Sequence, residues 1–183
     1  MWSLRRSLED NQDSYLVQSF VGETRVLGVV VNNTDTPMAD NDEMEVEGEE
    51  SEEEVGGTLE EVVLPWLEPT TSTLAVSNVV GDNFLQVTEA QVRLVNSVGD
   101  LLASVQPESP ITIAAVNEAG QVVVALRGGK VVYMSVAETS LAELGSKQME
   151  REVSCLNIHP FADSADIKKA GSCLLYTSPS PRD

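Results

Sequence analysis

The sequence predicts an all-β fold, and three observations lead to that prediction. The chain of 183 residues is 42% hydrophobic but only 4% aromatic, and much of its apolar content is valine, whose branched side chain favours strands over helices. Three segments share one outline, in which an apolar strand, a short polar turn and a second apolar strand follow one another. A further apolar segment precedes two of these hairpins. The repeated unit is therefore a sheet of three to four antiparallel strands.

The three hairpins are predicted in chain order. The first lies in the run DSYLVQSFVGETRVLGVVV from Asp13, with a turn at residues 22–23, and alternation leaves open which of its faces is buried. The second, GDNFLQVTEAQVRLV from Gly81, repeats the pattern of the first. The third, GQVVVALRGGKVVYMSV from Gly120, turns at residues 128–129, because glycine supplies the positive φ that tight hairpin turns require.

The spacing of these units predicts blades of a propeller. The strands that precede the second and third hairpins begin at Leu74 and Ile111, 37 positions apart, close to the period of propeller blades, about 40 to 45 residues. The sequence thus predicts a partial β-propeller of two to three blades of antiparallel strands. Residues 1–31 hold strands of a first, incomplete blade, and residues 58–160 form the other blades. Glu152–Ile158 is predicted to open a further blade, with Cys155 buried in mid-strand.

An acidic segment interrupts the repeat at residues 32–57. Its stretch from Asp40 to Glu54 holds ten acidic residues and no basic one, and the segment has too few apolar side chains to order itself. We predict a disordered acidic loop that acts as a solvated spacer. Two alternatives stay open: the segment mimics nucleic acid toward a basic partner such as a histone, or it presents Ser51 for phosphorylation.

The last segment, residues 161–183, is predicted to be an irregular tail. From Gly171 the sequence GSCLLYTSPSPRD changes abruptly to serine, proline and threonine, with no strand that would continue a blade. We predict that the chain is not native from about residue 171 and represents read-through of an adapter.

Charge and cysteine content narrow the class of partner and the compartment. Thirty acidic against 11 basic residues give a net charge of −19, which disfavours direct binding of nucleic acid. Two cysteines, Cys155 and Cys173, cannot make a disulfide framework, so a reducing compartment, the nucleus or the cytoplasm, is expected. The N-terminus MWSLRRSLEDNQ lacks the apolar stretch of a signal peptide, and no run approaches a membrane span. No membrane association is predicted.

The sequence holds no pattern typical of catalysis. His159 is the single histidine, and on an extended segment it would stand roughly 13 Å from Cys155. One histidine and two distant cysteines match no zinc site, and the carboxylates around Gly48 lack the EF-hand spacing. The glycine pair before Lys130 lacks the phosphate-loop frame. We therefore predict no enzyme, no cofactor, and no catalytic, cofactor-binding or metal-binding residues.

The aromatic residues allow two interpretations. Those within predicted strands could form a stacking platform for single-stranded nucleic acid, but without a basic groove core packing is favoured. They are Tyr15, Phe20, Phe84 and Tyr133. Trp2 and Trp66 lie near predicted loops, where packing between blades is favoured over anchoring a partner.

Five short runs carry a resemblance to a known family. MWSLR, SFVGETRVL, VRLV, GGKVVY and EVSCLNIHP occur in this order at propeller-like spacing, and together they resemble the DNA damage-binding protein 1 family. The resemblance covers residues 1 to about 163 and corresponds to the start of the middle one of three propellers. Splicing factor 3B subunit 3 and the large cleavage and polyadenylation specificity subunit share the outline around Trp2, Arg5-Arg6, Ser19-Phe20 and Gly128-Gly129, and they remain the alternative.

The resemblance implies a non-enzymatic adaptor of a cullin-4 ubiquitin ligase in the DNA damage response. In that family the middle propeller docks on cullin-4, and the other two hold interchangeable WD-type substrate receptors, in the nucleus and also the cytoplasm. Two departures from the family's pattern weigh against transferring this function directly to the chain. The acidic insert between Val31 and Leu59 is longer than expected, and the chain stops after two to three blades, so as it stands it is not expected to dock cullin-4. No motif in this segment marks cullin-contacting positions.

Overall fold

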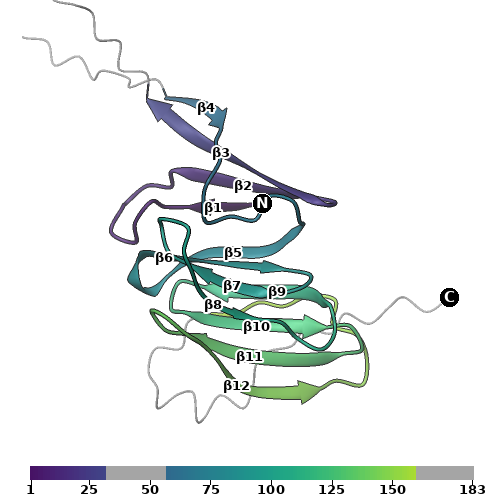
Figure 1. Cartoon of the computed structure of the whole chain (residues 1–183). Coiled ribbons are helices and arrows are strands. Elements are labelled where there is room, and N and C mark those ends of the chain that lie inside the picture. The colour runs from purple at the N-terminus through teal and green to yellow at the C-terminus, as the bar shows by residue number, and fades with distance from the viewer. Residues whose placement is uncertain (32–56, 160–183) are drawn as a thin grey trace, which may run out of the picture.

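The computed structural model describes residues 1–31 and 57–159, and this part of the chain forms three antiparallel sheets of four strands each. The first sheet contains β1 (Trp2–Leu4), β2 (Tyr15–Phe20), β3 (Glu23–Val31) and β4 (Gly57–Glu61), in that order. In Figure 1 the three sheets are stacked, with the first at the top and the third at the bottom. The predicted all-β fold with two to three blades is confirmed.

The second and third sheets repeat the order of the first. The second contains β5 (Thr73–Val79), β6 (Asn83–Thr88), β7 (Val92–Val95) and β8 (Leu101–Val105), with a 3-10 turn, η1 (Val80–Asp82), between its first two strands. The third contains β9 (Ile111–Asn117), β10 (Gln121–Leu126), β11 (Lys130–Val136) and β12 (Leu141–Gln148). In each sheet consecutive strands are neighbours, which is the arrangement of a propeller blade. None of the described residues belongs to a helix that is long and apolar enough to cross a membrane.

The predicted hairpins are the two central strands of each sheet. They are β2–β3, β6–β7 and β10–β11, so the three sequence segments are structurally equivalent. The third turn is where the glycine pair predicts it, and both Gly128 and Gly129 have positive φ, at 92° and 85°. The first turn lies one residue earlier than predicted, because Phe20 pairs with Glu23 and Gly22 takes the positive φ of 80°.

The first sheet is completed from beyond the acidic segment. Residues 1–31, predicted as an incomplete blade, supply three of its strands, and β4 pairs with β3 to add the fourth. Gly57, which the predicted insert includes, is the first residue of β4. The rest of the predicted disordered loop, with Gly48 and Ser51, lies outside the described residues, as does the predicted tail with Cys173.

Apolar side chains fill the two spaces between the sheets. The cluster between the first and second sheets includes Leu4, Val17, Val26, Val76 and Val95, all buried. The larger cluster between the second and third sheets is built from Val79, Leu85, Val87, Leu94, Ile111, Val122, Val124 and Met134. The first strands β1, β5 and β9 contact one another in turn. Each sheet is thus packed against the next, face to face.

The aromatic residues mostly pack in these cores, as predicted. Trp66 and Phe84 are each 2% exposed, and their rings stack with centroids 4.0 Å apart and an interplanar angle of 2°. Trp2 and Tyr15 pack against the same cluster from its edge, so packing between blades, favoured for both tryptophans, is confirmed. Phe20 departs from the prediction: it is 48% exposed at the end of β2, where the neighbouring sheet does not cover it.

The prediction of a further strand at Glu152–Ile158 is wrong. The segment has no strand, and it lies on the third sheet with Val153 and Ile158 buried against Val123 and Val131. A strand requires a hydrogen-bonded neighbour, and the pairing within the third sheet already ends at β9 and β12. Cys155 is exposed, because the side chains that anchor the segment are the two apolar residues on either side of it.

Candidate interaction surface

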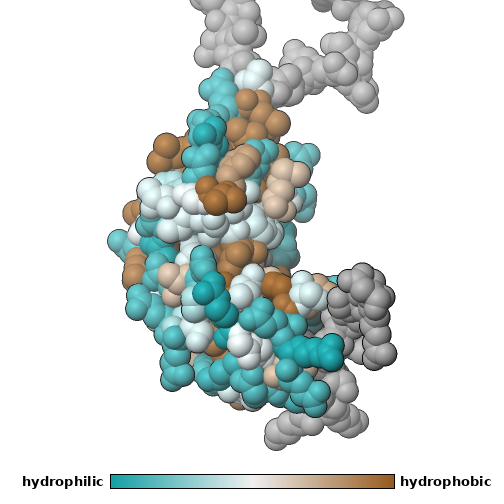
Figure 2. Space-filling model, turned by 90° about the vertical axis from the view of Figure 1, so that its right-hand side faces the viewer, coloured by the Kyte–Doolittle hydropathy of each residue, from teal (hydrophilic) through white to brown (hydrophobic). Residues whose placement is uncertain are grey.

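A groove crosses the end of the sheets at which the hairpin turns lie. It has a volume of about 620 Å³ and is lined by the β2–β3 turn, the residues just before β5, the β6–β7 turn and residues 107–110, which lead into β9. Figure 2 views the molecule from the side of these turns. Hydrophobic residues gather there over the first sheet, at the top, while the lower part is more hydrophilic. Four chain segments distant in sequence therefore build one concave surface.

The groove combines hydroxyl groups, carboxylates and one apolar tip. Its hydroxyl-bearing residues are Thr70, Thr71, Ser72, Thr88 and Ser109, and its acids are Glu89 and Glu108. Val21 stands at the tip of the first hairpin and is fully exposed, at 102%. Among the described residues, Thr71 Oγ1 is a buried oxygen without a hydrogen-bond partner. Such a surface offers hydrogen bonds, negative charge and an apolar contact to a partner.

The hairpin tip is held to the second sheet by Ser72. The backbone N–H of Gly22 donates to Ser72 Oγ at 2.8 Å, and Ser72 Oγ donates to the carbonyl of Phe20 at 2.8 Å. The residues on either side of Val21 are thus fixed relative to the chain that leads into β5. The exposed side chain of Val21 projects from a restrained turn, which lowers the entropy lost when a partner binds it.

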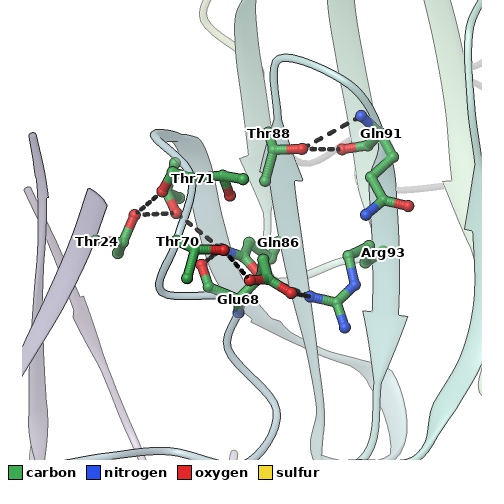
Figure 3. Close-up of polar contacts among 9 residues, drawn as sticks. Thr24, Glu68, Thr70, Thr71, Gln86, Thr88, Gln91 and Arg93 are labelled. Carbon is green, nitrogen blue, oxygen red and sulfur yellow. Dashed lines mark hydrogen bonds and ion pairs between the residues drawn. The ribbon is translucent and has the colours of Figure 1, made fainter. Parts of the chain in front are cut away.

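A buried polar network supports the groove from below (Figure 3). Gln86, on β6, is 1% exposed. Its Oε1 accepts from the Glu68 N–H at 2.9 Å, and its Nε2 donates to the Glu68 carbonyl at 3.1 Å and to Thr73 Oγ1 at 2.9 Å. Arg93, on β7, lies 3.8 Å from the Glu68 carboxylate. The side chain of Gln86 therefore satisfies backbone groups of the segment that links β4 to β5.

Thr24 extends this network to the first sheet. Its hydroxyl, on β3, donates to the Thr71 carbonyl at 2.7 Å and lies 2.8 Å from Thr73 Oγ1. Figure 3 shows Thr24 on the strand to the left of the second sheet, facing the Thr70–Thr71 segment. Because buried polar groups are costly unless paired, these contacts permit few relative positions of the two sheets. The groove therefore keeps its shape before any partner binds, because the two sheets that build it are held in place.

At the opposite end of the sheets, the β1–β2 loop (residues 5–14) crosses toward the second and third sheets. The Arg5 N–H donates to Asn78 Oδ1 at 3.0 Å, and Asn78 Nδ2 donates to the Arg5 carbonyl at 2.8 Å. The Arg5 guanidinium pairs with Glu118, in the turn before β10, and this hydrogen bond raises the pKa of Arg5. One loop of the first sheet thus contacts both of the others.

The residues weighed for chemistry lie elsewhere. Cys155 and His159 are both exposed on the segment after β12, and neither lines the groove. Lys130 begins β11, so the glycine pair before it forms a hairpin turn and not a phosphate loop. Among residues 1–31 and 57–159, no group of three or more histidine, cysteine, aspartate or glutamate residues could hold a metal ion.

Sequence reasoning missed the groove. A signal for it was present in the run of four hydroxyl residues, TTST, at positions 70–73, just before the strand predicted to begin at Leu74. Such a run in a linker indicates side-chain hydrogen bonds to backbone, and Ser72 does make them, with Gly22 and Phe20, whereas the Thr73 hydroxyl bonds the side chains of Thr24 and Gln86. What the run does not reveal is that residues 107–110 lie beside it, because that proximity follows from the packing of the sheets.

Comparison with known proteins agrees with this architecture. The family model described as the RSE1/DDB1/CPSF1 second beta-propeller matches residues 51–178. DNA damage-binding protein 1b of Arabidopsis thaliana is 32% identical over 186 aligned residues, and DNA damage-binding protein 1 of Oryza sativa subsp. japonica is 31% identical. Each alignment covers 100% of this chain and 15% of the relative. The family match extends past Gly171, so it lends no support to the prediction that the chain is foreign from there on.

Proposed function

Because the chain belongs to the RSE1/DDB1/CPSF1 second β-propeller family, we propose that it is part of a non-enzymatic scaffold of a cullin-4 ubiquitin ligase in the DNA damage response. The scaffold binds cullin-4 and WD-type substrate receptors, works in the nucleus and also the cytoplasm, and leaves the chemistry to its partners. The chain spans about 15% of the length of its relatives, so this function belongs to the longer protein that contains such a segment.

The observation that carries the proposal is the groove built jointly by the ends of neighbouring blades. A scaffold needs surfaces whose parts keep fixed relative positions, and the network of Gln86, Thr24 and Thr73 supplies that here. The exposed Val21 and the carboxylates of Glu89 and Glu108 give this surface a contact pattern of one apolar tip with acidic neighbours. Apolar anchors within a polar rim are typical of protein interfaces.

Affinity purification of the full-length protein that carries this chain tests the proposal. We expect cullin-4 and WD-type receptors to co-purify. A Val21→Asp, Glu108→Lys double variant should lose at least one of them, because it replaces the apolar tip and reverses a groove charge. Val98→Asp is the matched control: Val98 is 75% exposed in the β7–β8 loop, at the opposite end of the sheets. A clean purification without cullin-4 would refute the proposal.

The alternative is a propeller subunit of an RNA-processing complex. The matched family description itself joins three kinds of protein, and the runs around Trp2 and Gly128-Gly129 fit splicing factor 3B subunit 3 or the large cleavage and polyadenylation specificity subunit. The same purification separates the two functions, since spliceosomal or polyadenylation subunits would then replace cullin-4.

A further inference from the structure

The β1–β2 loop contains a serine at the contact between two blades. Ser7 Oγ donates to Asp82 Oδ1 at 2.9 Å, and the N–H of the next residue, Leu8, donates to the same oxygen at 2.8 Å. Asp82 is the last residue of η1, in the second sheet's first turn. These two hydrogen bonds therefore join a loop of the first blade to a turn of the second.

Asp82 depends on these donors. Its carboxylate accepts from Leu8 and from Ser7, and the two bonds lower its pKa, with the backbone bond from Leu8 as the larger cause. Its φ is +56°, the single positive value of a non-glycine residue within the described chain, a conformation that costs free energy unless neighbouring contacts hold it. The contact with the loop thus stabilises both the charge and the backbone of Asp82.

Ser7 is half-buried on a loop that an enzyme can reach after a local opening. The loop has no strand between residues 5 and 14, and both the Ser7–Asp82 bond and the flanking side chains of Arg6 and Glu9 are exposed. Opening such a loop locally costs little compared with unfolding a blade. Charged residues stand on both sides of the hydroxyl, with arginines at the two preceding positions and Glu9 and Asp10 two and three positions later.

We propose that Ser7 is a phosphorylation site, and that its phosphorylation releases the β1–β2 loop from the second blade. A serine kinase would transfer the γ-phosphoryl group of ATP to Ser7 Oγ. The new bond joins Oγ to phosphorus, the bond from phosphorus to the β,γ-bridging oxygen breaks, ADP leaves, and the hydroxyl proton passes to a base of the kinase. The donor hydroxyl of the Ser7–Asp82 contact is lost in this step.

The consequence follows from charge. The phosphate brings a charge of about −1.5 to −2 and only acceptor oxygens at neutral pH, at a position where Asp82 now receives a hydrogen bond at 2.9 Å. Asp10, whose carboxylate accepts from the Ser7 N–H at 3.0 Å, adds a second negative group. The Arg5 guanidinium is already engaged, by Glu118 at Nη2 and by the Leu8 and Asp10 carbonyls at Nη1. Repulsion therefore opens the contact, and the Leu8 N–H loses its acceptor.

The test begins with labelling of the purified chain. It is incubated with ATP and, in separate reactions, with a kinase that selects acidic residues after the acceptor and one that selects arginines before it. Mass spectrometry of the peptides should place phosphate on Ser7, and Ser7→Ala should remove it. Ser3→Ala, on neighbouring β1, should leave the label unchanged. Phosphate on Ser7 from either kinase supports the site, and its absence from both reactions overturns it.

Hydrogen exchange tests the release. In the phosphorylated chain we expect the Leu8 amide to exchange about tenfold faster or more, because its acceptor is lost, while the amide of Val87, inside β6, stays unchanged. Asp82→Asn, in the unphosphorylated chain, should leave Leu8 protected, since its side-chain oxygen still accepts. Phosphate on Ser7 with an unchanged Leu8 exchange rate would overturn the release of the loop.

Discussion

Replacing Gln86 by leucine tests the polar joint between the first two blades. Leucine has a similar volume, so the buried site keeps its packing but loses the bonds to the Glu68 N–H, the Glu68 carbonyl and Thr73 Oγ1. Each hydrogen bond contributes a net 0.5 to 1.5 kcal/mol, and unpaired partners add a desolvation cost. The expected loss in the free energy of unfolding is therefore about 2 to 4 kcal/mol.

Urea unfolding followed by circular dichroism measures this loss, as a lower midpoint at an unchanged slope. Gln106→Leu is the matched control, because Gln106 lies just after β8 and is exposed; surface changes of this kind usually stay within about 0.5 kcal/mol. If Gln86→Leu unfolded within about 0.5 kcal/mol of the unchanged chain, the network would not be what holds the linker between the blades, and our reasoning would fail.

Three further predictions concern single residues. Trp66→Ala removes the stack on Phe84 and should cost about 3 to 5 kcal/mol in chemical unfolding; a loss below about 1 kcal/mol would contradict packing between the blades. Gly129→Ala should lower the melting temperature, because φ is +85° and a Cβ would meet a backbone oxygen at 2.8 Å, whereas Gly145→Ala, with open space, should change it little. The pKa of Asp82 is lowered, so its bonds contribute above about pH 4 and are lost as pH falls further; Asp82→Asn should flatten that part of the acid unfolding curve, and an unchanged curve would count against it.

The central hairpins could be predicted because their signals are local. β10 and β11 are short apolar runs rich in valine, and Gly128 and Gly129 supply the turn between them. The equivalent runs of β6 and β7 recur one blade earlier. The spacing of the repeats and the residues that form a turn depend on nearby positions in the chain. Both can therefore be recognised from the sequence without knowledge of the packing.

The fourth strands were missed for the opposite reason. β12 reads LAELGSKQ and is almost wholly exposed, so burial imposes no alternation on it, and it is a strand because β11 pairs with it. The strand predicted around Cys155 was wrong for the converse reason. Its run of residues has no neighbouring strand to pair with in the described part of the chain, so it packs on the third sheet as an irregular segment. The groove was also beyond prediction, because Thr71 and Pro107 are brought together by the stacking of two blades.

The position of one blade against the next cannot come from the apolar cores alone. Burial of apolar area has no direction, and two valine-rich faces could slide past each other at small cost. Polar contacts at both ends of the sheets remove that freedom: Thr24 with Thr71 and Thr73 at the groove, and Asn78 and Asp82 at the β1–β2 loop. A displaced blade would leave several of these groups buried without partners. The surface offered to a partner is composed of several blades, so its shape depends on these few polar residues more than on the hydrophobic area beneath them.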